Sequence, residues 1–154
     1  MNATKFTAFI LLFGVLLGLA GRARSESKHF QASQRHFEEL ATRAASLSAD
    51  VDTPGEKNLC NYFTATAMAY SVRAHALAQL ADAADKVRLP EDKALLRQKL
   101  LESQSFTTQY IEGDIRFVED ISAPSRNSRI RELGLRLLNE LRVFEHNAAS
   151  LAYD

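Results

Sequence analysis

The residues best suited to chemistry are one cysteine, Cys60, and four histidines, because thiolates and imidazoles act as nucleophiles, proton carriers and metal ligands. In an antiparallel helical bundle the histidines would all lie in the same half of the molecule. Their helical spacing nevertheless places them on different faces, so that their side chains do not converge. We therefore expect no metal or haem site at His29, His36, His75 and His146.

The sequence also lacks the motifs that position catalytic groups. It contains no Cys-x-x-Cys-His for haem attachment and no Glu-x-x-His pair for a di-iron centre. It has no His-Glu-x-x-His, no Gly-x-Ser-x-Gly and no glycine-rich phosphate loop. A nucleophile without a placed base is not a catalytic site. We expect a protein that is not an enzyme and that carries no cofactor.

Cys60 is the only cysteine, so it cannot form an intramolecular disulfide. In an exported protein a leftover cysteine indicates pairing between two chains, which would give a homodimer linked through Cys60. The alternative is a buried thiol that packs as a small apolar side chain. The sequence leaves both open.

Residues 1–23 have the pattern of a signal peptide. Lys5 supplies the positive charge, and an apolar run follows, Phe6 to Ala20 (FTAFILLFGVLLGLA). Small residues allow cleavage after Ala23 or after Ala20. Cleavage after Ala23 would leave one domain, residues 24–154, exported to the periplasm or secreted, with no stable membrane insertion. The alternative is that the segment is retained as a membrane anchor.

The charge balance argues against nucleic acid as a partner. The chain has 19 basic and 19 acidic residues. Removal of Lys5 and Arg22 with the signal peptide would leave 17 basic against 19 acidic residues, a formal charge of −2. Proteins that bind nucleic acid through the phosphate backbone normally present a strongly basic surface.

Apolar residues recur at three- and four-residue spacing in four stretches, which predicts four amphipathic helices. The first three are expected over residues 27–48, 54–87 and 90–121, and the stripe of the fourth runs from Ile130 to Leu151. Pro54, Pro90 and Pro124 mark the breaks between them, with Thr53 as a helix cap and Ser122 or Ser125 as another. No stretch alternates like a strand. The expected fold is all-α, an elongated up-down-up-down four-helix bundle after the signal peptide.

The second stretch, residues 59–87, is rich in alanine and is apolar on more than one side. A helix of this kind is either central in its domain or part of an oligomer contact. We favour the central position; the alternative places Cys60 and Met68 in a dimer seam.

Two further features are candidates for binding. The fourth helix carries arginines, including Arg129 and Arg136, that form either a solvated face or a docking surface for an anionic partner. The middle of the third helix, residues 103–109, is polar. Its hydroxyl groups either bond to their own helix carbonyls or line a ligand pocket.

These observations predict an exported, non-catalytic helical bundle that acts by binding another, unidentified protein. The expected contact residues are Arg129, Arg136, Cys60 and Met68. The alternative function is a carrier or sensor of a small molecule, haem among the candidates, held between the helices. Fold analogy alone does not choose between them.

Overall fold

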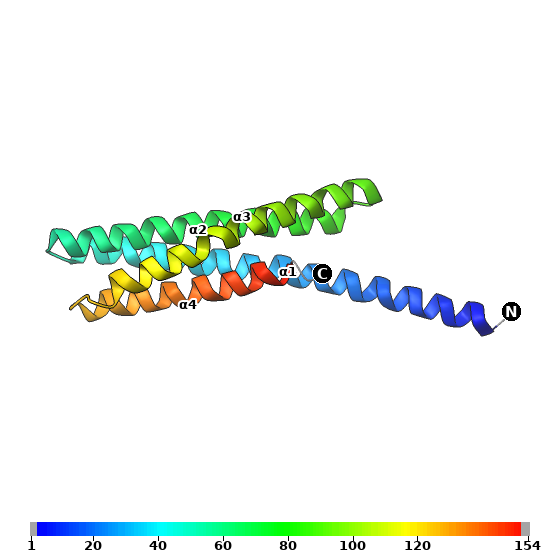
Figure 1. Ribbon diagram of the computed structural model, residues 1–154, viewed down its shortest axis with the longest axis horizontal. Coiled ribbons are helices and arrows are strands. Elements are labelled where there is room, and N and C mark those ends of the chain that lie inside the picture. The colour runs from blue at the N-terminus through cyan, green and yellow to red at the C-terminus, as the bar shows by residue number, and fades with distance from the viewer. Residues whose placement is uncertain (1–2, 152–154) are drawn as a thin grey trace.

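A computed structural model describes the backbone of residues 3–151 and the side chains of residues 27–151. This part of the chain contains four helices and no strand (Figure 1). The helices are α1 (Ala3–Asp50), α2 (Pro54–Lys86), α3 (Pro90–Ser122) and α4 (Ser128–Ser150). The prediction of an all-α chain with four helices is therefore confirmed.

The helix boundaries follow from local chemistry. Thr53 caps α2, because its hydroxyl oxygen accepts a hydrogen bond from the Glu56 amide at 3.3 Å, and Pro54 occupies the first helical position, as predicted. Pro90 begins α3 in the same way. The expected serine cap of α4 is wrong. Asn127 performs this role, since its side-chain oxygen accepts from the Arg129 amide at 3.0 Å.

The first helix is longer than expected. It was predicted to begin near Ser27, but α1 is continuous from Ala3. No proline interrupts residues 1–53, and a helix already formed extends at little cost through single weak positions. The side chains of the expected signal peptide, residues 1–23, lie outside those described. In the described part, no helix is both long and apolar enough to cross a membrane.

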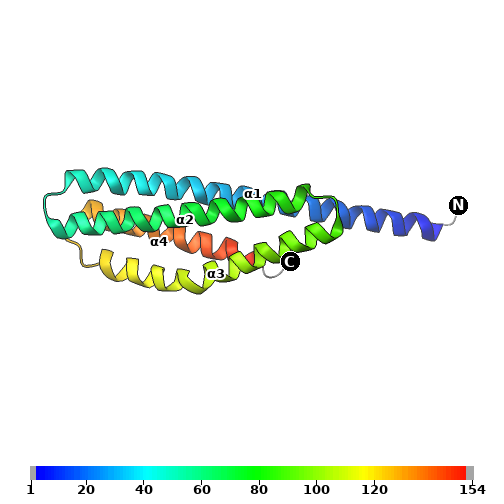
Figure 2. The same cartoon turned by 90° about the horizontal axis from the view of Figure 1, so that it is seen from above.

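Successive helices run in opposite directions, up-down-up-down (Figures 1 and 2). The helix pair α1–α2 has the most extensive contact, and α2 and α4 each contact all three other helices. Between α1 and α3 the described residues make no contact, so these two helices lie at opposite corners (Figure 2). The α4 helix has 23 residues and stops short of the α2–α3 turn, whereas the start of α1 extends past it.

Aromatic rings from three helices meet in the centre. Phe144 of α4 packs edge-on against Phe37 and Phe30 of α1, with centroids 5.7 and 6.0 Å apart. Tyr70 of α2 completes the group, 5.7 Å from Phe37 and 5.9 Å from Phe144. All four side chains are buried. Edge-to-face pairs at this separation are favourable beyond the apolar area that they bury.

The buried face of α2 is made largely of small side chains. Alanines recur along it at three-, four- and seven-residue spacing, and α1 presents Ala41 and Ala44. Small side chains allow two helices to approach closely, which explains why α1 and α2 form the most extensive pair. The expectation that α2 is central agrees with its contacts to every other helix. Its buried alanines are Ala67, Ala74, Ala78, Ala81 and Ala84.

One glycine is required by the packing of α3 against α4. A Cβ at Gly134 would overlap the Ser122 Cβ and lie 2.9 Å from the Ser122 hydroxyl oxygen, and the Phe63 ring is 3.4 Å away. Gly113, in the middle of α3, has open space around it. The same substitution should thus have opposite effects at these two positions.

We predict that Gly134→Ala lowers the free energy of unfolding by about 1–3 kcal/mol, because the added methyl group forces α3 and α4 apart. The matched variant Gly113→Ala should raise it by about 0.5–1 kcal/mol through better helix propensity. Urea unfolding followed by circular dichroism measures both. Equal effects of the two substitutions would contradict the close approach at Gly134.

Candidate functional site

Arg129 and Arg136, predicted to contact a partner, lie on the same flank of α4, where it faces α1. They line a hollow of about 350 Å³ between the two helices, together with Arg43 of α1. Leu47 and Leu133 provide apolar surface in the same hollow. The two arginines are two turns apart on α4, which brings them to one side of the helix. The structure therefore places Arg129 and Arg136 on one continuous surface.

The arginines of this surface differ in how they are neutralised. Arg129 forms an ion pair with Asp50 at 2.7 Å, which joins the start of α4 to the end of α1. Arg136 pairs with Glu132 on its own helix at 2.6 Å. Arg43 is exposed and forms no ion pair with the described residues. It is the cation in this hollow that is available to an anionic group.

A second hollow of about 410 Å³ continues along α1 and α4 and shares Arg43, Glu132 and Arg136 with the first. We call the two together the α1–α4 groove. Glu140 forms part of its wall although the residue is only 8% exposed. One carboxylate oxygen, Oε2, lies 3.1 Å from His36 Nδ1. The other oxygen, Oε1, is buried and has no hydrogen-bond partner in the described part of the chain.

An unsatisfied buried carboxylate oxygen is unfavourable, since the charge has lost water without gaining a full set of donors. Native proteins keep such groups rarely, and each one calls for an explanation. In Glu140 the unpartnered oxygen belongs to a residue lining an open groove. Because Oε1 itself is closed to solvent, a donor from outside the bundle reaches it only when the Glu140 side chain turns toward the groove.

Cys60 and Met68 do not form a common surface. Cys60 is fully buried, and burial raises the pKa of its thiol, with Glu56 adding to the effect and Arg129 opposing it. Met68 is 58% exposed on the outer face of α2. A fully buried, protonated thiol favours the buried-thiol alternative over a disulfide between chains.

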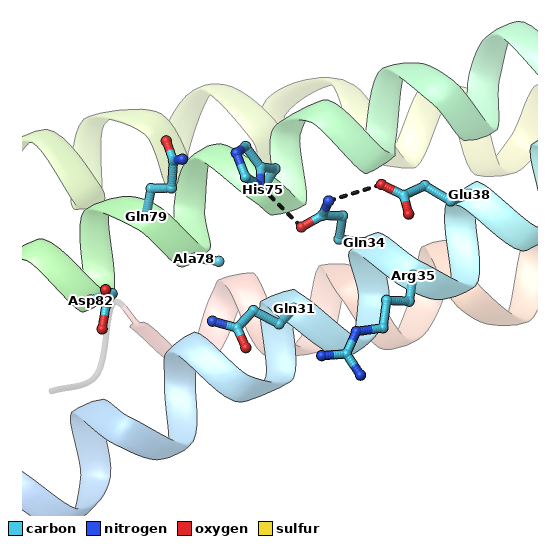
Figure 3. A pocket seen from close by; sticks show the side chains of 8 residues that line it. All are labelled: Gln31, Gln34, Arg35, Glu38, His75, Ala78, Gln79 and Asp82. Atoms are coloured by element: carbon cyan, nitrogen blue, oxygen red, sulfur yellow. Dashed lines mark hydrogen bonds between the residues drawn. The ribbon is translucent and has the colours of Figure 1, made fainter.

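His36 and His75 take part in separate polar contacts. His75 Nδ1 lies 3.0 Å from Gln34 Oε1, and the Gln34 amide donates to Glu38 Oε1 at 2.8 Å (Figure 3). The Ser71 hydroxyl donates to the same Glu38 oxygen at 3.3 Å. His75, Gln34 and Glu38 border an open polar hollow of about 410 Å³ between α1 and α2. Among residues 27–151, no three His, Cys, Asp or Glu side chains are arranged to hold a metal ion.

Two hydroxyl groups in the polar middle of α3 donate to carbonyls of their own helix, so neither requires a ligand. The Thr107 hydroxyl donates to the Ser103 carbonyl at 2.9 Å, and the Thr108 hydroxyl donates to the Gln104 carbonyl at 3.2 Å. Both are bonds within the helix, one of the two interpretations of this segment. Nearby, the Tyr70 hydroxyl donates to Asp114 Oδ2 at 2.6 Å and links α2 to α3. Burial and Asp114 together raise the pKa of Tyr70, which keeps this hydroxyl a donor.

Sequence reasoning missed three groups that the structure makes prominent. The sequence analysis singled out neither Arg43 of α1 nor Glu140 of α4. Glu140 is paired with His36 of α1, and the hollows that Arg43 lines are formed by two helices, so spacing along one helix gives no signal for either residue. Exposed aromatic side chains on α3 were also missed. They could have been noticed from Phe106 and Tyr110, one helical turn apart outside the apolar stripe.

The half-satisfied carboxylate generates a stability prediction. We expect Glu140→Leu to raise the free energy of unfolding by about 1 kcal/mol, because it removes a poorly solvated charge from the packed interface. His36→Ala should lower it by about 1–2 kcal/mol, since the whole carboxylate would then be buried without a partner. Urea denaturation of both variants tests this, and destabilisation by Glu140→Leu would show that Oε1 is satisfied.

Burial of Cys60 generates a reactivity prediction. The thiol of the folded protein should resist alkylation by iodoacetamide at pH 8, because it is both inaccessible and held protonated. It should react rapidly once the chain is unfolded in guanidinium chloride. Mass spectrometry of the alkylated chain measures the extent, and fast labelling of the native protein would contradict a buried thiol.

Comparisons with other proteins do not add a second line of evidence. No protein-family model matches the chain, and neither the curated proteins nor the solved structures give a significant match.

Proposed function

We propose that the protein is an exported, non-catalytic helical bundle that binds a protein partner along the α1–α4 groove. The observation that carries this proposal is the buried Glu140 carboxylate, whose Oε1 lacks a partner while the residue lines the groove. A basic side chain of the partner supplies the missing donor when the Glu140 side chain turns toward the groove. A charge-assisted hydrogen bond of this kind is roughly twice as strong as a neutral one.

Basic and acidic side chains are distributed unevenly along the groove, and this distribution restricts which charges a partner can present. At one end Arg43 and Arg129 are accompanied by Arg136, and Glu132 is the only acid lining that hollow. The other hollow is lined by the acids Glu39 and Glu140 in addition to the shared Arg43, Glu132 and Arg136. A segment with acidic residues near Arg43 and a lysine or arginine near Glu140 complements this pattern. Complementary charges fix register and accelerate association.

Apolar side chains between the charges support a protein as the ligand. Leu40 and Leu47 of α1 and Leu133 of α4 line the groove, and Leu135 adds a side chain that is 64% exposed. Protein interfaces commonly combine apolar contacts with a charged rim. Because the groove is open and extends over several turns of both helices, an extended or helical segment fits it better than a compact molecule does.

Export, homodimerisation and the small-molecule alternative rest on separate observations and need separate tests. Export rests on the signal-peptide pattern of residues 1–23, and N-terminal sequencing of the mature protein tests cleavage after Ala23. Homodimerisation through Cys60 would require its buried side chain to become exposed. A small-molecule or haem carrier remains the alternative, tested by absorbance and mass spectra of protein purified without denaturation.

Binding can be tested by capture from the envelope or secreted extract of the source organism. We expect the double variant Arg43→Glu/Arg136→Glu to reduce recovery of the specific partner at least tenfold, because it reverses two charges of the groove. Glu140→Gln should also weaken capture, since it removes the charge that receives the basic side chain.

The matched control is Arg116→Glu/Arg142→Glu. Arg116 has an i,i+4 ion pair like that of Arg136, and Arg142 pairs with Glu119, yet neither residue lines the groove. Their reversal should leave capture unchanged. Equal capture by wild type and by the groove variants would reject the groove as the binding surface.

A further inference from the structure

The contact between His36 and Glu140 joins an exposed side chain to a buried one. The His36 side chain is 59% exposed, whereas that of Glu140 is 10% exposed, and Nδ1 of the imidazole lies 3.1 Å from Oε2 of the carboxylate. An exposed imidazole exchanges protons freely with the solvent, and imidazole changes its charge between pH 5 and 8. Through His36, the covered carboxylate therefore responds to the pH outside the bundle.

The carboxylate of Glu140 cannot offer an oxygen to the α1–α4 groove while this contact is intact. Oε2 is bound to His36, and Oε1 is buried without a partner. A half-turn about the Cγ–Cδ bond exchanges the two oxygens and leaves one of them in the closed position. Exposing an oxygen thus requires the whole side chain to swing out and leave His36. The imidazole and a basic side chain of a partner therefore compete for the same carboxylate.

Protonation of His36 decides the strength of this competition. An ionised carboxylate only accepts hydrogen bonds, so Nδ1 is the donor whether the imidazole is neutral or charged. The charged imidazole donates a charge-assisted bond, which is roughly twice as strong as a neutral one. His36 also lines the groove, where its positive charge repels an incoming cation. Both effects hold Glu140 inside the bundle at low pH.

The other charged groups of this hollow do not change the direction of the effect. They belong to α1 and α4, and α2 and α3 contribute none of its described lining residues. Carboxylates and guanidinium groups ordinarily keep their charge between pH 5.5 and 7.5. The imidazole is the lining group that changes charge in that range. The charged residues that line the hollow with the His36–Glu140 pair are Glu39, Arg43, Glu132 and Arg136.

From this geometry we propose that His36 is a pH switch for the α1–α4 groove, whose protonated imidazole holds Glu140 inside the bundle and whose neutral form releases the carboxylate to a basic group. The inference rests on the proposed function, in which the groove receives a basic side chain. A cation that binds Glu140 displaces His36 and favours loss of its proton. Affinity therefore rises with pH, by at most about tenfold per pH unit for one proton.

A small cation tests the switch in the full-length protein without the partner. Ethylguanidinium is the probe, and NMR of protein with ¹³C-labelled glutamate follows the carboxyl signal of Glu140, assigned by its loss in Glu140→Gln. We expect the dissociation constant for the probe to be about 3- to 10-fold lower at pH 7.5 than at pH 5.5. Equal binding at both pH values, or no binding at Glu140 at either, would overturn the proposal.

Two asparagine variants separate His36 from other titrating groups. His36→Asn keeps an amide donor near the position of Nδ1 but cannot become charged, so the dissociation constant should no longer depend on pH. His75→Asn is the matched control, because His75 Nδ1 also contacts one side-chain oxygen, Gln34 Oε1, but in the hollow between α1 and α2. This control should keep the wild-type pH dependence. Dependence that persists in His36→Asn, or that disappears in His75→Asn, would reject His36 as the switch.

Capture from the extract at the same two pH values distinguishes failure of the switch from failure of the proposed function. Groove-dependent capture that is equal at pH 5.5 and 7.5 would support the protein partner and reject the switch. Binding of ethylguanidinium with the expected pH dependence, but without any groove-dependent capture, would support the switch and reject the protein partner. Weaker capture by the wild type at pH 5.5, with no such loss in His36→Asn, would support both.

Discussion

The packing of α1 against the alanine face of α2 is the constraint on which the rest of the structure depends. Alanine side chains on the buried face of α2 let the two helices approach closely over their shared length. The aromatic rings of Phe30, Phe37, Tyr70 and Phe144 then fill the centre and bring in α4. With no disulfide available to a single cysteine, this close packing must supply the stability of the domain.

The position of α3 is a consequence of that arrangement. Because α2 and α4 occupy the short diagonal of the bundle, α3 contacts both of them and does not reach α1. Fewer of its residues are buried, and polar side chains such as Gln104 and Thr107 are found among those that are. Gly134 allows α4 to meet the end of α3 at Ser122. Phe106, Tyr110 and Phe117 of α3 remain about half exposed, although Phe117 packs against the Tyr62 ring of α2.

The sequence predicted the fold well because helix periodicity and helix breakers are local signals. Pro54, Pro90 and the Thr53 cap lie where expected, and Phe37, Leu77, Ile111 and Leu141 are buried as their spacing indicated. The start of α1 was wrong, since no strong breaker separates residues 3–26 from the bundle. For the candidate site, periodicity placed Arg129 and Arg136 together, but it gave no account of Glu140 or Arg43. Their roles depend on which helix lies opposite, and one helix's sequence does not contain that information.

The shortness of α4 divides the bundle into unequal halves. At the end with the α1–α2 and α3–α4 turns, all four helices are present, whereas the α2–α3 turn extends beyond the last residues of α4. Backbone amides near Lys86 and Pro90 are therefore shielded by fewer neighbours than those near Phe63 or Ile130. Local opening should begin at this end and spread toward the aromatic centre, which gives the molecule a gradient of hydrogen-exchange protection along its axis.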